Sequence, residues 1–294
     1  MLSILERLER EEVLLSDGAW GTELQAKGLK AGECPEEWNI SHREEVKATA
    51  EAYIQAGSDM ILTNTFGGSR FKLANFGLAD RVRELNREGT SISREAAGED
   101  HLVAASVGPT GKLLQPFGDV SEDQMYEVFC EQISAQAEGG ADAILVETMS
   151  DLREASLAIK AAKDVTDLPV MATMTFEKGK MGYRTMMGVT IEQAVEGLLK
   201  AGADIIGTNC GNGIEEIIEI IAEMRKLTDA YLLAHPNAGK PQLIGGKTVF
   251  TQTPEVMASH VRELVDAGAN IIGGCCGTGP EHIRAMAKVL KFNR

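Results

Sequence analysis

The chain has 294 residues with 44 acidic and 29 basic side chains, which gives a formal net charge of −15 at pH 7. This acidity repels phosphate backbones and anionic lipid surfaces, so we expect neither nucleic acid nor a membrane as a partner. Five cysteines, an odd number, and a charged N-terminus without the apolar run of a signal peptide predict a cytoplasmic protein with reduced thiols.

A short repeat recurs along the chain and indicates a joint between a helix and a strand. Each copy contains glycine, a small residue, Asp or Asn, and then an apolar pair. Glycine at that point can take the left-handed conformation that ends a helix, and the apolar run suits a buried parallel strand. The copies occupy residues 56–61, 139–144, 201–206 and 267–272.

Four other apolar runs alternate with these repeats, at residues 13–16, 102–107, 170–175 and 231–234. Eight strands that alternate with helices over about 250 residues are the pattern of the (β/α)₈ barrel. We therefore predict an α/β protein with a single domain, residues 1–294, folded as a TIM barrel. A doubly wound open sheet is the competing topology.

Polar residues follow the predicted strands, where a barrel places its active site. The first strand ends at Asp17 and Gly18, which offer a carboxylate and flexible backbone to a small ligand or form an ordinary Asp-Gly turn. Residues 63–66, Thr-Asn-Thr-Phe, follow the second strand. Glu147 ends the fourth strand, either as a site carboxylate or as half of a structural ion pair.

Two long connections can cover this end of the barrel. They span residues 108–119 after the third strand and 177–189 after the fifth, and the second is rich in methionine. Loops of this length are often functional and methionine-rich surfaces adapt to partners, although an ordinary surface excursion is the simpler interpretation. Residues 34–39 are expected to form a third lip.

Three cysteines gather at the predicted ends of the sixth and eighth strands. Cys275 and Cys276 are adjacent between glycines, and Cys210 lies 65 residues earlier in a similar glycine-flanked segment. Neighbours on a strand point to opposite faces, so the pair converges only where the backbone turns, which glycine permits. Three thiolates match tetrahedral zinc with an open fourth position, which favours catalysis. Cysteines that only fill the core are the alternative.

His235 ends the seventh predicted strand. It is a fourth metal ligand, a hydrogen-bond donor or a structural histidine, and the sequence leaves these alternatives open. Residues 277–280 begin the last helix, where barrels often bind phosphate. We rank phosphate below zinc because thiolates repel it and no basic cluster accompanies them. Cys34 and Cys130 are expected to be free thiols.

The strand ends carry the motifs Asp17-Gly18-Ala19, Thr63-Asn64-Thr65-Phe66, Glu147-Thr148, Asn209-Cys210, Pro236-Asn237-Ala238-Gly239 and Gly273-Gly274-Cys275-Cys276-Gly277-Thr278. Together, over nearly the whole chain, they resemble the homocysteine S-methyltransferase family. That family includes the homocysteine-binding module of cobalamin-dependent methionine synthase, betaine–homocysteine methyltransferase and S-methylmethionine-dependent enzymes. Its members use a zinc-bearing (β/α)₈ barrel.

The resemblance implies a role for each matching residue. Cys210, Cys275 and Cys276 would hold Zn²⁺ and serve catalysis. Glu147 would receive the amino group of homocysteine, Asp17 and the Gly18 backbone would help to seat it, and Thr65 is a further substrate-binding candidate. Zinc would bind the substrate thiol and favour its thiolate near neutral pH. The implied function is zinc-dependent methyl transfer to homocysteine, which yields methionine.

The methyl donor is left open among betaine, S-methylmethionine, S-adenosylmethionine and a methyl-corrinoid. A corrinoid would have to arrive on a partner protein, because the chain has no Asp-x-His-x-x-Gly motif. One alternative function is a methyltransferase that exchanges methyl groups with a separate corrinoid protein and uses another thiol. Another is a non-catalytic module that binds zinc or thiols. The oligomeric state and the physiological direction are not predicted.

Overall fold

The protein is described by a computed structural model over residues 2–10, 12–244 and 247–291, and within these ranges eight parallel strands form one sheet. The order in the sheet is β1-β12-β9-β8-β5-β4-β3-β2. From β2 to β12, each strand therefore pairs with the strand of this sheet that comes next along the chain, and β12 pairs with β1. The strands are β1 (Leu14–Leu15), β2 (Met60–Leu62), β3 (Leu102–Val107), β4 (Ala143–Met149), β5 (Val170–Met174), β8 (Ile205–Asn209), β9 (Tyr231–His235) and β12 (Ile271–Ile272).

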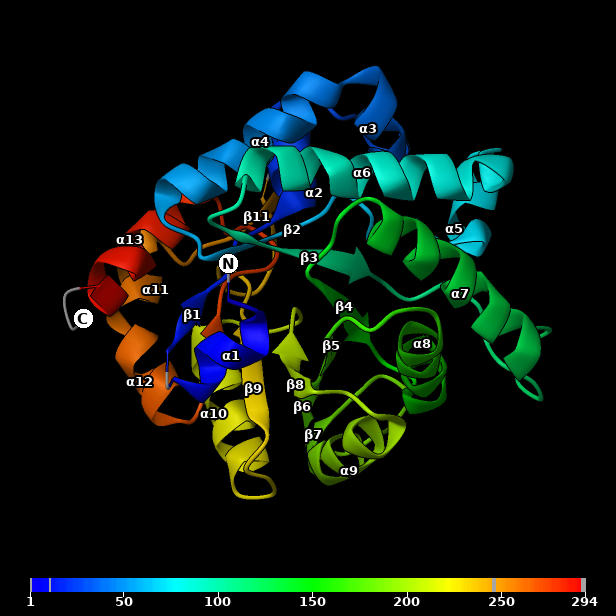
Figure 1. Ribbon diagram of the computed structural model, residues 1–294. Helices are drawn as coiled ribbons and strands as arrows, with labels where there is room; N and C mark the ends of the chain where they lie inside the picture. Colours follow the sequence, from blue (N-terminus) through cyan, green and yellow to red (C-terminus); the bar gives the residue numbers. More distant parts are fainter. Residues whose placement is uncertain (1, 11, 245–246, 292–294) are drawn as a thin grey trace.

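A backbone hydrogen bond joins the two ends of this sheet. The Asp59 N–H donates to the Leu15 carbonyl at 2.6 Å, which brings β2 beside β1 and nearly closes the barrel. Figure 1 shows the strands enclosed by helices. The prediction of a TIM barrel is confirmed, and the alternative of a doubly wound open sheet is wrong.

The longer helices cover the barrel because they present apolar residues to its core. In α9 the buried residues Ile191, Ala194, Val195 and Leu198 recur at the spacing of one helix face. The helices are α1 (Ile4–Glu9), α2 (Trp20–Ala26), α3 (Trp38–Ser41), α4 (Arg43–Ala56), α5 (Arg70–Ala74), α6 (Val82–Ala97), α7 (Glu122–Glu138), α8 (Leu152–Val165), α9 (Ile191–Ala201), α10 (Ile214–Arg225), α11 (Pro254–Ser259), α12 (Val261–Asp266) and α13 (Pro280–Lys291), with 3₁₀ turns at Pro35–Glu37 and Ala79–Arg81.

The repeated segment has a structural role that explains its recurrence. Its glycines, Gly57, Gly140, Gly202 and Gly268, all have positive φ, as predicted for a helix end. Its Asp or Asn accepts a hydrogen bond from the backbone N–H of the first or second residue of the preceding strand in the barrel. These bonds are Leu15 N to Asp59 Oδ2 at 2.9 Å, Val103 N to Asp142 Oδ2 at 2.8 Å, Val170 N to Asp204 Oδ2 at 2.7 Å, and Leu232 N to Asn270 Oδ1 at 2.9 Å.

Each of these acceptors also meets a basic side chain. The pairs are Arg7 with Asp59, Arg94 with Asp142, Lys163 with Asp204, and Arg225 with Asn270. The same contact therefore fixes the register between strands four times around the amino-terminal end of the barrel. Helix α1 packs at this end, where Ile4 and Leu8 are buried and Arg7 meets Asp59.

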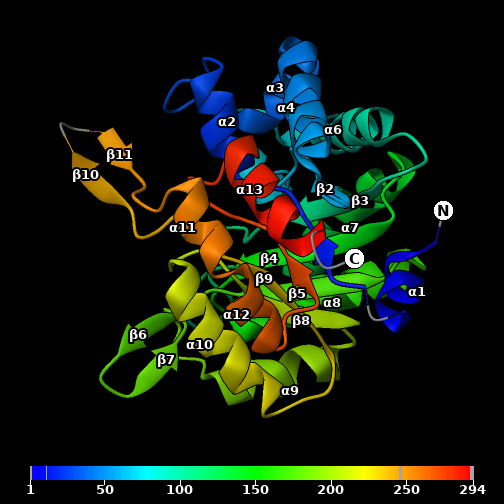
Figure 2. The ribbon, with the colours of Figure 1, turned by 90° about the vertical axis from the view of Figure 1, so that its left-hand side faces the viewer.

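Two antiparallel hairpins rise from the opposite end, in the part of the chain that the structure describes. They are β6–β7 (Glu177–Gly179 and Gly182–Arg184), after β5, and β10–β11 (Gln242–Ile244 and Lys247–Val249), after β9. Figure 2 shows both projecting from the side of the barrel that lies away from α1. The first hairpin forms part of the long connection predicted at 177–189. None of the described helices combines the length and hydropathy needed to cross a membrane.

Candidate functional site

Three thiols lie together at the carboxyl ends of β8 and β12. The sulfur atoms of Cys210, Cys275 and Cys276 lie within 4.8 Å of one another, and the Cys210 and Cys276 sulfurs are 3.8 Å apart. The convergence that the sequence predicted therefore occurs. It depends on glycine, because a Cβ on Gly274 would lie 2.2 Å from the Thr278 hydroxyl and one on Gly277 would lie 2.3 Å from the Phe250 ring.

Backbone hydrogen bonds from the segment after β9 hold the cysteines in place. The Cys210 N–H donates to the His235 carbonyl at 3.1 Å, and the Cys275 N–H donates to the Pro236 carbonyl at 2.8 Å. The Cys276 carbonyl accepts from Ala238 N–H at 3.0 Å. The thiols are thus positioned by three neighbouring strand ends rather than by one flexible loop.

Among the three thiols, Cys210 takes the first negative charge, and the other two donate hydrogen bonds to it. Hydrogen bonds from Cys275 and Cys276 lower the pKa of the Cys210 thiol to about 3. The hydrogen bond to Cys210 raises the pKa of Cys276 to about 12, and it also raises the pKa of Cys275 well above the usual range of a thiol. A second and third thiolate therefore need a cation beside them, as in metal sites, where binding releases the thiol protons.

The donor atoms present fit a zinc ion. Three soft thiolates and no carboxylate suit zinc rather than magnesium or calcium. The Asn237 amide hydrogen-bonds the Cys210 thiol, while its buried Oδ1 has no hydrogen-bond partner among the described residues. The contact with Cys210 favours its thiolate, the form in which a cysteine binds a metal.

Glu147 lies inside β4 beside this cluster and is buried. Ser106 Oγ donates to its Oε1, and Asn209 Nδ2 donates to its Oε2 at 3.0 Å. Burial raises the pKa of Glu147 to about 7, with Asp17 and Cys210 as lesser causes. The strand continues two residues beyond the predicted end and shifts register between Val146 and Met149.

Asn209 connects the carboxylate with the thiols. Its Oδ1 accepts from Thr148 N–H at 2.8 Å and from Thr173 Oγ1 at 2.7 Å, which fixes the orientation of the amide. Its Nδ2 then points to Glu147 and lies 3.9 Å from the Cys275 sulfur. Asn209 directly precedes Cys210 in the sequence, and this position was the available signal for a role that was not predicted.

Two residues at the site have left-handed backbones although they are not glycine. Thr148 has φ of 61° and Cys210 has φ of 62°. Such values are unusual, above all for a β-branched residue, and such strain clusters at functional sites. At Thr148 it turns the backbone N–H toward Asn209, and at Cys210 it accompanies the turn that ends β8.

Asp17 and Gly18 follow β1 as predicted, with different exposure to the site. The Asp17 carboxylate is buried, accepts from Leu62 N–H at 2.7 Å and Trp20 Nε1 at 2.8 Å, and has its pKa raised by burial to about 7. Gly18 lines the cavity, and a Cβ there would lie 2.3 Å from the Thr278 carbonyl oxygen. Asp17 is not among the described residues that line the cavity, so its contact with the cavity wall runs through Trp20, and a part in seating a substrate stays a prediction.

Thr65 is buried, but it is not among the residues that line the cavity. Its hydroxyl donates to the Ser106 carbonyl at 2.8 Å and accepts from Gln136 Nε2 at 2.8 Å. Thr63 and Ser106 do line the cavity. Direct substrate binding by Thr65 stays a prediction, whereas its contacts support the wall that Ser106 forms. A polar residue within an apolar strand was the signal that could have identified Ser106.

The thiols, Gly18 and Glu147 open into one cavity of about 250 Å³. Drug-sized ligands occupy roughly 300 to 1,000 Å³, so this cavity suits a molecule of amino-acid size. No Lys, Arg or His is found among the described residues that line this cavity. A second buried carboxylate, that of Glu36, lines it together with Glu147. Glu36 lies in the predicted third lip and accepts from Gly67 N–H at 2.6 Å.

His235 ends β9 and is buried, and burial lowers its pKa to about 3, so its ring is neutral. In the described part of the chain, the group of side chains close enough to share a metal consists of the three cysteines and does not include His235. His235 is therefore not a fourth ligand in this geometry. Cys34 and Cys130 are free thiols, as expected.

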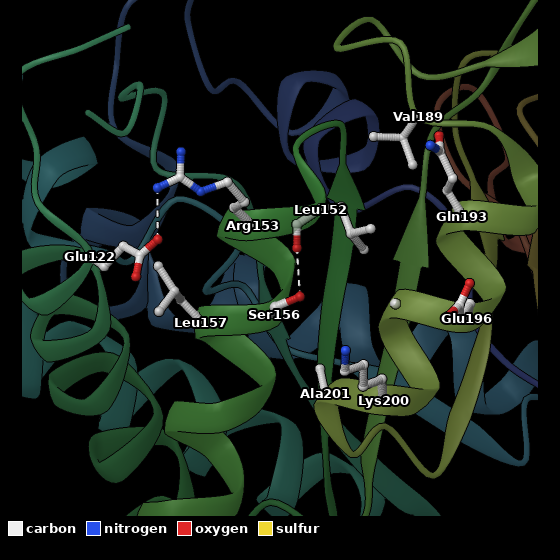
Figure 3. Close-up of a pocket in the computed structure, with 11 residues that line it drawn as sticks. Glu122, Leu152, Arg153, Ser156, Leu157, Val189, Gln193, Glu196, Lys200 and Ala201 are labelled. Atoms are coloured by element: carbon white, nitrogen blue, oxygen red, sulfur yellow. Dashed lines mark hydrogen bonds and ion pairs between the residues drawn. The ribbon is translucent and has the colours of Figure 1, made fainter. Parts of the chain in front are cut away.

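A larger cavity of about 640 Å³ lies outside the barrel, between α8 and α9 (Figure 3). Its charged groups are surface residues, with Arg153 paired to Glu122 at 2.7 Å. Its lining, as far as the structure describes it, includes neither a thiol nor a buried carboxylate. The smaller cavity at the thiols is therefore the candidate site.

Comparison with known proteins agrees with this geometry. The family profile described as Homocysteine S-methyltransferase matches residues 14–290. Methionine synthase from Mycobacterium tuberculosis is 32% identical over 296 residues, which cover 94% of this chain and 24% of that protein, so the chain spans about a quarter of this relative.

Solved structures of homocysteine methyltransferase MmuM from Escherichia coli share the fold. Its metallated form has a TM-score of 0.81 at 22% identity, covering 96% of this chain and 98% of that one. Its oxidized form has a TM-score of 0.80 at 22% identity, covering 98% of both chains. With the family profile matched over nearly all of its length, this chain belongs to the homocysteine S-methyltransferase family.

Proposed function

We propose that this protein transfers a methyl group to the thiol of homocysteine, with zinc held by Cys210, Cys275 and Cys276, and so forms methionine. The observation that carries the proposal is the opening of the three thiols and the buried Glu147 into one cavity of amino-acid size. Zinc bound there would act as a Lewis acid that favours the substrate thiolate near neutral pH.

The protein's own residues would bind and orient homocysteine. Glu147 would accept the substrate ammonium group, which would favour the ionised carboxylate and lower its raised pKa. The substrate carboxylate would find backbone N–H groups near Gly18, whose own N–H has no acceptor among the described residues. Asp17 would hold that loop through Trp20.

The reaction that follows is a displacement at carbon. The thiol gives up its proton to water, the sulfur electron pair forms the new S–CH₃ bond, and the bond from the methyl carbon to the donor breaks. The leaving group departs with that electron pair. The protein contributes alignment of sulfur and methyl carbon, which is a large part of such catalysis.

Zinc content and methyl transfer of the Cys275→Ala variant test this function. We expect the wild type to hold one zinc per chain and to form methionine, and Cys275→Ala to lose both. The matched control is Cys130→Ala, which removes a free thiol on α7 and should change neither. A zinc-free wild type, or an active Cys275→Ala, would refute the proposal, and thiol binding without transfer from any donor would favour a binding module.

A second candidate concerns the donor. The connections around the mouth expose large apolar side chains, among them Phe117 at 81% and Met186 at 79%, beside Leu113 and Met187. The cavity has room for the acceptor amino acid, and the exposed rim supports a donor that arrives on another protein, such as a methyl-corrinoid protein. This candidate keeps the same thiol chemistry.

A comparison of methyl donors distinguishes a small-molecule donor from a donor that a carrier protein delivers. Initial rates are measured with S-methylmethionine, betaine, S-adenosylmethionine and methylcobalamin, each in the wild type and in Phe117→Ser. A carrier-borne donor predicts poor rates with the three small donors and slow transfer from free methylcobalamin. Rapid turnover of a small donor, unchanged in Phe117→Ser, would contradict the carrier.

A further inference from the structure

The loop after β1 and the metal-binding loop after β12 are joined by direct hydrogen bonds. Ala19 N–H donates to the Thr278 carbonyl at 2.8 Å, Gly274 N–H donates to the Asp17 carbonyl at 2.8 Å, and Gly277 N–H donates to Thr22 Oγ1 at 3.3 Å. The first loop and the start of α2 line the cavity with residues 18–22, and the second loop carries Cys275 and Cys276.

Thr278 ties this junction to the thiols. Its hydroxyl donates to the Cys275 carbonyl at 2.6 Å, and its own N–H donates to the same oxygen at 3.1 Å. Thr278 packs tightly against the glycines of both loops. A Cβ on Gly18 would lie 2.3 Å from the Thr278 carbonyl oxygen, and one on Gly274 would lie 2.2 Å from the Thr278 hydroxyl. A displacement of one loop therefore has to move the other.

One side chain from outside both loops closes the junction. The Tyr53 hydroxyl, on α4, lies 2.9 Å from the Ala19 carbonyl and 3.1 Å from the Thr278 carbonyl. Tyr53 is fully buried, and burial raises its pKa, so the hydroxyl keeps the proton that it donates. It does not line the cavity, so it can act on a ligand only through the two loops.

We propose that Tyr53 and Thr278 form a brace that couples occupancy of the cavity beside residues 18–22 to the position of Cys275 and Cys276. Tyr53 is a positioning residue: a ligand that settles the first loop also settles the metal-binding loop, and the reverse. The choice of an amino acid as that ligand rests on the proposed function. Coupling of this kind is reciprocal, so metal must strengthen amino-acid binding by the factor by which the amino acid strengthens metal binding.

The test uses L-norvaline, which has the shape of homocysteine with a methyl group in place of the thiol and cannot bind zinc through sulfur. Zinc release to a chelator is timed with and without norvaline in the wild type, in Tyr53→Phe and in Tyr126→Phe. Tyr126 is the matched control, because its hydroxyl donates to Asp164 at 2.8 Å on the outer face. The wild type and both variants should start with one zinc.

Norvaline should slow zinc release from the wild type and from Tyr126→Phe at least about 5-fold, the lower end of typical coupling between sites. In Tyr53→Phe the ratio should fall toward 1. Equal ratios in the wild type and Tyr53→Phe, or a ratio of 1 in the wild type, overturn the brace while leaving methyl transfer intact. If Tyr53→Phe does not fold, Thr22→Val removes the bond to Gly277 and should lower the same ratio.

A zinc-free wild type would refute the proposed function and still leave the brace testable. In metal-free protein with the Cys130→Ala background, norvaline should slow the reaction of the cluster thiols with a disulfide reagent. Tyr53→Phe should abolish this protection. Protection that is equal in both proteins, or absent from the wild type, overturns the brace on this measurement too.

Discussion

Burial of the Glu147 carboxyl group lowers the stability of the folded protein, and it places this group in the wall of the candidate site. Its pKa is raised from 4.5 to about 7 by burial, so the folded protein binds more protons here than the unfolded chain between these two pH values. Stability therefore falls as pH rises through this window, and above it the folded state carries the full penalty of the buried anion. At about 1.4 kcal/mol per pKa unit, this penalty reaches about 3 kcal/mol.

Glu147→Gln should remove that penalty. The variant keeps a side chain that can hydrogen-bond Ser106 and Asn209, so metal-free Glu147→Gln should be more stable than the wild type at pH 8, by up to about 3 kcal/mol. The gain should shrink as pH falls toward 4.5, and methyl transfer should drop sharply. Urea unfolding at several pH values measures it, and a gain that does not depend on pH would contradict the assignment.

The site residues differ in how far the sequence could predict them. Cys210, Cys275 and Cys276 were predictable because three thiols at strand ends have few other roles. Ser106 was predictable only in part, because a polar residue within an apolar strand marks it, but its contact with Glu147 exists only in the folded barrel. The positive φ of Thr148 was also beyond the sequence, because the contact with Asn209 that imposes it joins strands distant in the chain.

Among the elements, the repeated joint between helix and strand is the clearest case of a pattern with a physical cause. The sequence predicted its glycine, whereas the role of its Asp or Asn required the neighbouring strand. At the last copy Asn270 accepts from Leu232 N–H and from Arg225, as Asp142 does from Val103 N–H and Arg94. An amide oxygen is therefore sufficient at this position.

This equivalence predicts unequal effects of two substitutions. Asp142→Ala leaves the Val103 N–H without its acceptor and should lower the free energy of unfolding by about 1 to 3 kcal/mol. Asp142→Asn retains an oxygen there and should cost about 1 kcal/mol or less, the worth of the partly exposed ion pair with Arg94. Denaturant titration of both variants decides it. Equal losses would mean that charge, not the hydrogen bond, matters.

The strands of the two hairpins were not predicted from the sequence. The β6–β7 hairpin lies in a connection that was expected to be long, residues 177–189, whereas no prediction covered the segment of β10–β11. Both hairpins pair only three residues per strand and lack a strong apolar alternation. Their pairing depends on the positions at which β5 and β9 end in the folded barrel. The strands themselves were predictable, because a parallel strand covered on both faces reads as a short apolar run.

At the scale of the whole molecule, charge and fold act together on the choice of substrate. The chain carries a net charge of −15, and its cavity is lined by Glu36 and Glu147 without a basic side chain among the described residues. An occupant with a positive group is favoured there, and a carboxylate depends on backbone N–H groups near Gly18. Homocysteine, a zwitterion, satisfies both ends of the cavity in the proposed function.

Two analogues of homocysteine separate these contributions. Removal of the carboxylate gives 3-aminopropane-1-thiol, which keeps the ammonium group for Glu147, whereas removal of the amino group gives 4-mercaptobutyrate, an anion that faces two carboxylates. The amine should therefore be the better acceptor, with kcat/KM above that of the acid by at least about 10-fold, since one lost charged contact in a buried site is worth about 1.5 to 3 kcal/mol. In Glu147→Gln this preference should shrink, because the anionic partner is gone while the backbone near Gly18 is unchanged. Steady-state rates of thiol methylation measure both, and a wild type that prefers the acid would place the ammonium group away from Glu147.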